Sequence, residues 1–118
     1  MRAAAIYDIH GNLPALEAVL QDIRRAGVDE IVVGGDVVPG PMPRETLDHL
    51  LSLDLPVRFI HGNGEIAILE QMAGREPVSV PEPVRPLVRW TAEQLPVEYQ
   101  PILAGWPKTL SISISGLG

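Results

Sequence analysis

Three short polar clusters hold the residues of this 118-residue chain whose types best suit chemistry: Asp8-Ile9-His10, Gly35-Asp36 and Gly62-Asn63. Two carboxylates, an imidazole and a carboxamide oxygen form a mixed nitrogen and oxygen ligand set suited to Mn²⁺, Fe, Zn²⁺ or Ni²⁺. Because a carboxylate has two oxygens, Asp36 is able to bridge two ions. Two ions about 3.5–4 Å apart clamp the attacking and leaving oxygens of a phosphoryl displacement.

Each cluster alone is a weak signal, since Gly-Asp turns and Asn after Gly are common in ordinary loops. Their conjunction is more specific, because each cluster follows an apolar run that predicts a β-strand, at 2–7, 31–33 and 57–60. The carboxyl ends of neighbouring parallel strands lie at one edge of a sheet, where ligands bind in open α/β folds. We therefore expect the side chains of the three clusters to converge there.

Helical patterns separate these strands and position the clusters. Residues 13–23 carry leucine and isoleucine at helical spacing, with Asn12 as a candidate N-cap, Pro14 in the first turn and Gly27 as a stop. A second helix is indicated by Leu47, Leu50 and Leu51, and a short third one by Ile66 and Leu69. Such βαβαβ alternation predicts an α/β fold with parallel strands and crossover helices.

The second half of the chain is less regular. Four prolines between 75 and 86 predict a linker or surface excursion within a single domain spanning 1–118. Beyond it we expect a helix over 84–95, a short helix over 99–105 and a half-buried strand over 109–115. A strand that runs into Gly116-Leu117-Gly118 normally has a hairpin partner, so we expect this chain to be shorter than the fold to which it belongs.

Composition and net charge exclude some classes of function. The formal net charge is −6 and no Lys/Arg run is present, which argues against an extended nucleic-acid surface. A small phosphorylated substrate stays compatible, because a bound divalent ion inverts the local charge. No cysteine is present and no apolar run approaches the ~18 residues that span a bilayer, so we expect a cytoplasmic protein without a thiolate metal site.

The three clusters and their surroundings resemble the N-terminal part of the calcineurin-like metallophosphoesterases, in particular a small prokaryotic subfamily. The matching stretches are Ile6 to Leu16, Gly34 to Pro41 and Gly62 to Glu65, with a looser likeness through 90–95 to the end. The resemblance implies the start of an αββα sandwich with an incomplete second sheet. It also implies hydrolysis of phosphomonoesters or phosphodiesters by a hydroxide that bridges two metal ions. Asp8 and His10 would bind the first ion, Asp36 would bridge both, and Asn63 would bind the second, which gives Asp36 and Asn63 a part in catalysis.

Two departures from the family pattern affect the expected activity. Where the third motif often carries a histidine that assists the leaving group, this chain has Gly64. The family also supplies further metal-binding histidines from later His-Gly and Gly-His-x-His motifs, which 1–118 does not contain. Within 1–118 the first ion has three protein ligands and the second only two. We therefore expect weak or no two-metal hydrolysis by these 118 residues.

The other histidines do not complete this set. His61 precedes Gly62 directly and is a candidate for contacting substrate, with an ordinary hydrogen bond at the strand end as the alternative. His49 falls among the leucines of the second helix, where a surface or packing role is expected.

Two other readings remain open. A non-catalytic α/β module would use the 109–115 strand as an unpaired edge, and such edges pair with other chains, which favours a homodimer. A dinucleotide-binding unit is the more distant alternative, because the loop after the first strand reads Asp-x-His-Gly-Asn and not Gly-x-Gly-x-x-Gly.

Overall fold

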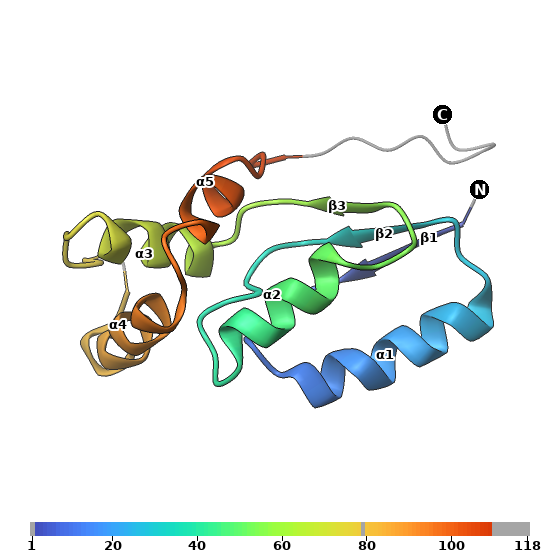
Figure 1. The fold of residues 1–118 in the computed structure, drawn as a ribbon, viewed down its shortest axis with the longest axis horizontal. Helices are drawn as coiled ribbons and strands as arrows, with labels where there is room; N and C mark the ends of the chain where they lie inside the picture. The colour runs from blue at the N-terminus through green and yellow to red at the C-terminus, as the bar shows by residue number, and fades with distance from the viewer. Residues whose placement is uncertain (1, 79, 110–118) are drawn as a thin grey trace.

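The computed structural model describes residues 2–78 and 80–109, and a three-stranded parallel sheet in the order β1-β2-β3 lies at its centre. The strands are β1 (Ala3–Ile6), β2 (Glu30–Val33) and β3 (Val57–Phe59). Ile6 is level with Val33, and Val33 is level with Phe59. The three carboxyl ends therefore share one edge of the sheet (Figure 1), which confirms the predicted α/β class and parallel βαβαβ start.

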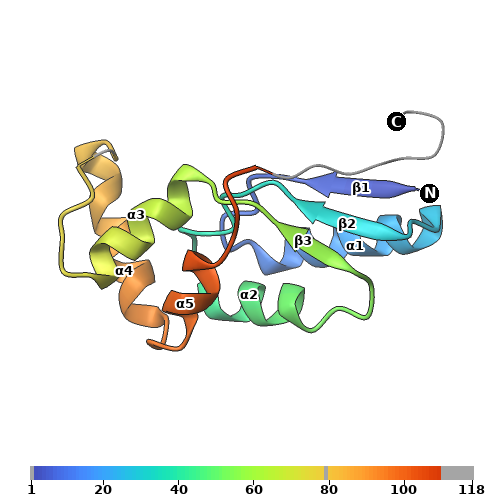
Figure 2. The ribbon, with the colours of Figure 1, turned by 90° about the horizontal axis from the view of Figure 1, so that it is seen from above.

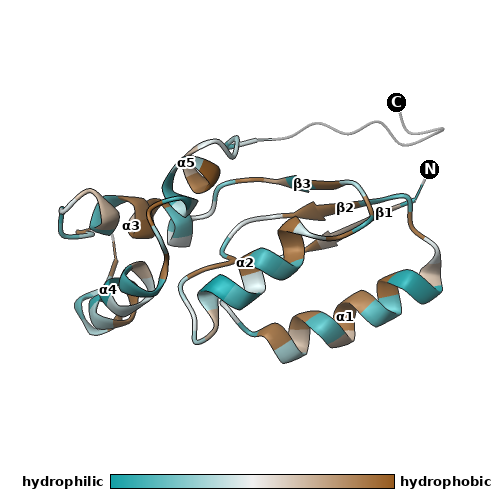
Figure 3. Ribbon diagram, in the orientation of Figure 1, coloured by the Kyte–Doolittle hydropathy of each residue, from teal (hydrophilic) through white to brown (hydrophobic). Residues whose placement is uncertain are grey.

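Two crossover helices cover one face of this sheet (Figure 2): α1 (Leu13–Ala26) and α2 (Pro43–Leu51). Along α1 the hydrophobic and hydrophilic residues alternate at helical spacing (Figure 3), and Leu16, Leu20 and Ile23 are buried. They pack in one core with Ile31 and Val33 of the central strand. Burying a side chain of this kind contributes about 1.5–3 kcal/mol, so the apolar stripe holds α1 against the sheet.

The predicted ends of α1 are confirmed. The Asn12 side chain accepts a hydrogen bond from the Ala15 N–H at 3.2 Å, as an N-cap does. Gly27 adopts the left-handed conformation (φ 69°), and its N–H donates to the Arg24 carbonyl oxygen at 3.2 Å. These caps set where the chain leaves the loop after β1 and re-enters the sheet.

The opposite face of the sheet has none of the described helices against it (Figure 2). The register places Ala5, Val32 and Arg58 side by side there. Arg58 forms an ion pair with Glu30 at 3.1 Å. The family's second sheet would begin with 109–115, which apart from Thr109 lies outside the described residues, so that sheet and the proposed homodimer edge stay predictions.

Three further α-helices lie beyond the carboxyl ends of the strands (Figures 1 and 2): α3 (Asn63–Met72), α4 (Arg85–Gln94) and α5 (Tyr99–Ala104). The segment 75–86, where the prolines predict a linker or surface excursion, leads from α3 into α4. Glu82–Val84 forms a 3-10 turn, η1, and Pro86 lies in the first turn of α4. Proline is tolerated there because the first helical N–H groups have no intrahelical acceptor. Within the described ranges, no helix has the length and apolarity needed to cross a membrane.

Candidate metal centre

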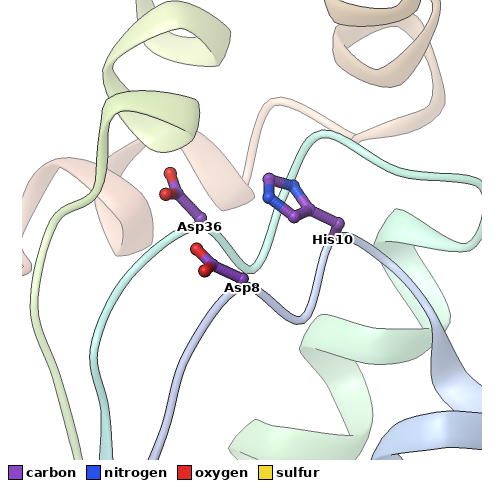
Figure 4. A group of neighbouring side chains, drawn as sticks. All are labelled: Asp8, His10 and Asp36. Atoms are coloured by element: carbon purple, nitrogen blue, oxygen red, sulfur yellow. The ribbon is translucent and has the colours of Figure 1, made fainter.

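Asp8, His10 and Asp36 converge at the carboxyl edge of the sheet, as the strand order predicts. Asp8 and His10 follow β1, and Asp36 follows β2. One ligand atom from each lies within 4.8 Å of the other two, and the three side chains point into a shared space (Figure 4). Asp8 and His10 are exposed and Asp36 is half-buried, so an ion reaches this group from solvent.

All three residues adopt a backbone conformation that non-glycine residues rarely use. The φ angles are 53° for Asp8, 47° for His10 and 55° for Asp36. Each such residue costs about 1–3 kcal/mol and persists only where the surroundings enforce it. Here two hydrogen bonds between the loops supply that constraint: His10 N–H donates to Asp36 O at 2.9 Å, and Gly11 N–H donates to Val37 O at 2.7 Å.

The His10 ring is oriented by a backbone carbonyl. Its Nδ1 lies 3.1 Å from the Pro39 oxygen, which can only accept, so Nδ1 carries the proton. The Nε2 lone pair is then available for a metal ion. Histidines that bind metals commonly donate their other ring N–H to a carbonyl or carboxylate in this way, which fixes the tautomer and the ring plane.

Glu65 joins the loop after β2 to the start of α3. Its fully buried carboxylate accepts hydrogen bonds from the N–H groups of Asp36 (2.8 Å), Val38 (3.2 Å) and Gly62 (2.8 Å). Burial raises the pKa of this carboxyl above its ordinary value. The three N–H groups act in the opposite direction, and the charge of Asp36 adds a smaller increase. Sequence reasoning did not assign Glu65 a role, although its place three residues after the N-cap Gly62 is that of the acidic residue in a capping box.

Gly64, the position where the family often carries a histidine, lies too close to the loop after β2 to accept a side chain. Its N–H donates to Asp36 Oδ1 at 2.7 Å. A Cβ at this position would lie 1.9 Å from the Val38 carbonyl oxygen, a distance at which the backbone must move. The glycine therefore lets the start of α3 approach Asp36 and orient its carboxylate.

Asn63 is the first residue of α3, which begins three residues before Ile66, the first apolar residue from which this helix was predicted. It lines a cavity of about 260 Å³ together with His10 and Asp36, so all three clusters reach one space. His61 is directed elsewhere: its Nε2–H donates to the Leu103 carbonyl oxygen of α5, and its N–H donates to Pro107 O at 2.8 Å. Its contact with substrate stays a prediction. His49 lies near the end of α2, half-buried.

The donors present fit a divalent ion. Two ligand atoms that are each about 2.1 Å from one ion are at most about 4.2 Å apart. One ligand atom from each of Asp8, His10 and Asp36 lies within 4.8 Å of the other two, which is close to this limit. Nitrogen and oxygen donors without sulfur suit Mn²⁺, Fe, Zn²⁺ or Ni²⁺ without selecting one of them.

The fold and this site define a parallel α/β chain with a candidate centre for divalent metal ions at the carboxyl edge of its sheet. The family model of the calcineurin-like phosphoesterases matches residues 1–109, and the chain belongs to this family. An uncharacterized protein of the archaeon Methanocaldococcus jannaschii is 42% identical over 67 residues, which are 56% of this chain and 27% of that protein. The matched part thus spans about a quarter of the relative's length.

Proposed function

We propose that Asp8, His10, Asp36 and Asn63 bind divalent metal ions and that this chain carries the N-terminal half of a phosphoester hydrolase site. The observation that carries the proposal is the convergence of Asp8, His10 and Asp36, with His10 Nδ1–H held by Pro39 O so that Nε2 is available. A surface cluster without this function would have no need of three residues in the left-handed region.

The residues divide the work of such a site. Divalent ions bound here would polarise phosphoryl oxygens and lower the pKa of a bound water. Asp36 receives the Gly64 N–H on Oδ1, which fixes its carboxylate plane and leaves Oδ2 and the remaining Oδ1 lone pairs as donors to one or two ions. Gly64 offers no side chain to protonate a leaving group, so that proton has to come from solvent or from another residue.

Metal binding by the purified chain tests the proposal directly. The chain is loaded with Mn²⁺ or Zn²⁺ and dialysed against metal-free buffer. We expect one ion per chain to be retained, with a second ion bound more weakly because only Asp36 and Asn63 contribute to it. Asp36→Ala should abolish retention, since Asp36 belongs to both sets. Asp54→Ala is the matched control, because Asp54 is exposed and precedes β3 at the opposite end of the sheet.

Hydrolysis of bis-p-nitrophenyl phosphate with added Mn²⁺ is the second measurement. We expect little or no turnover by these 118 residues, because a second ion with two protein ligands is held weakly. In the dialysis experiment, protein that retains no metal and whose stability is the same with and without added metal would overturn the proposal in favour of a non-catalytic module. Vigorous turnover that Asp36→Ala abolishes would keep the metal site and overturn the expectation of weak activity.

A further inference from the structure

The cavity that contains His10, Asp36 and Asn63 is chemically two-sided. His10 and Asp36 lie in the loops after β1 and β2, Asn63 is the first residue of α3, and their side chains form the polar end of the cavity. The other end is a wall supplied by the loop after β2, by α3 and the segment after it, and by η1 and α4. The apolar residues that line it are Pro39, Ala67, Val80, Pro81, Val84 and Val88.

This wall is a built part of the fold. Val88 is 1% exposed and belongs to the core, whereas Val84 is 38% exposed and forms the rim. The segment before η1 is tied to α4, since Arg85 Nε donates to the Val80 carbonyl oxygen at 3.1 Å. Arg89 pairs with Glu76 of the same segment at 3.3 Å.

The arginines of α4 therefore bind groups of the segment before η1. No Lys or Arg is among the described residues that line the cavity. A ligand group that lies against the apolar wall contacts methyl and methylene groups. A second phosphate, or a sugar with several hydroxyls, would lose its water there without gaining hydrogen bonds, which is unfavourable.

The volume of the cavity limits the size of the ligand that it can hold. Cavities that hold drug-sized ligands measure about 300–1,000 Å³, and this one measures about 260 Å³. A single phosphate with a short alkyl chain or one aromatic ring matches the space better than a nucleotide.

We propose that the wall formed by Val80, Val84 and Val88 binds the apolar organic group of a small phosphoester, whose phosphate lies against His10, Asp36 and Asn63. This rests on the proposed function, because it takes the polar end of the cavity as the phosphate side. It adds the substrate class: esters of small apolar alcohols or phenols.

Binding of a homologous series to the Zn²⁺-loaded chain tests the proposal without relying on turnover. The probes are inorganic phosphate and methyl, ethyl, propyl and phenyl phosphate, measured by calorimetry and by the ¹³C-methyl signals of the valines. We expect affinity to rise about fourfold for each added methylene until the wall is covered. The methyl signals of Val80, Val84 and Val88 should shift with propyl and phenyl phosphate and much less with inorganic phosphate.

Val84→Thr supplies the variant and Val97→Thr the matched control. Val84 is half-exposed, so the added hydroxyl should leave the fold intact, whereas Val97 is 70% exposed and is not among the residues that line the cavity. We expect Val84→Thr to weaken the dependence of affinity on the length of the alkyl group and Val97→Thr to preserve it. Affinities that do not change with chain length, alongside metal-dependent phosphate binding, would overturn the subsite and leave the proposed function standing. Absence of metal-dependent phosphate binding would overturn both.

Discussion

The carboxylate that joins the loops at the carboxyl ends of the strands has a different kind of partner from two carboxylates elsewhere on the molecule. At the site, one buried carboxylate, Glu65, accepts three backbone N–H groups from two loops. Two carboxylates elsewhere pair with side chains: Glu30 with Arg58 on the face of the sheet opposite α1 and α2, and Asp48 of α2 with the Tyr99 hydroxyl of α5.

This difference has an energetic consequence. A backbone N–H that loses a buried acceptor stays in place without a partner, and each costs about 1–3 kcal/mol. Arg58 and Asp48 are about half exposed, so water replaces a lost partner and such pairs contribute little. The loops of the candidate metal centre should therefore depend on one side chain far more than the outer contacts do.

The largest expected effect is that of Glu65→Ala. Three N–H groups lose their acceptor, that of Val38 buried and those of Asp36 and Gly62 part-buried, so we expect the free energy of unfolding to fall by about 3–6 kcal/mol, a large share of the stability of a small domain. Glu30→Ala is the control, since it also removes a buried carboxylate but breaks only the ion pair with half-exposed Arg58, at a cost of about 1 kcal/mol or less. Urea unfolding of both variants measures this, and equal losses would contradict the comparison.

Gly64→Ala comes second. The added Cβ would lie 1.9 Å from Val38 O, so the start of α3 must move away from Asp36, at an expected cost of about 2 kcal/mol or more in stability. The same contact applies to Gly64→His, so restoring the family's histidine should weaken metal retention and not provide a leaving-group acid. Gly105→Ala is the control, because the atom nearest to its added Cβ, the Pro101 carbonyl oxygen, would be 3.2 Å away and its φ is −78°. Unchanged metal retention in Gly64→His would contradict this view.

The smallest expected effect is that of Tyr99→Phe, and it depends on pH. The hydrogen bond to Asp48 raises the pKa of the Tyr99 hydroxyl above 10.0, with burial and the Asp48 charge acting in the same direction. The folded state therefore holds this proton more tightly than the unfolded chain does. The stabilisation, about 1 kcal/mol, is fully present below pH 10 and is lost as pH rises through the raised pKa.

Unfolding midpoints of the wild type and Tyr99→Phe should accordingly differ at pH 8 and approach each other above pH 10. Tyr7→Phe removes the hydroxyl of a tyrosine that is 61% exposed and serves as the control. A difference between wild type and Tyr99→Phe that stays constant up to pH 11 would show that Tyr99 stabilises only by packing.

Much of the site was predictable because it follows from strand order. The residues after β1 and β2 had to meet once the strands were parallel neighbours, and Asp8, His10 and Asp36 do meet. Asn63 reaches the same cavity after β3. Glu65 was missed because its partners are backbone groups 27 to 29 residues away, apart from Gly62, and no local pattern marks such contacts.

The sequence by itself determined the α/β class, the ends of α1 and the edge of the sheet at which the polar clusters gather, because periodicity, caps and the alternation of strands and helices along the chain are local properties. Only the tertiary structure decided how those clusters are held. The left-handed backbone of Asp8, His10 and Asp36, the contact of His10 with Pro39 and the apolar wall from α4 all depend on segments distant in sequence. Their positions follow from packing and from the pairing of buried N–H groups, which no single stretch of the chain encodes.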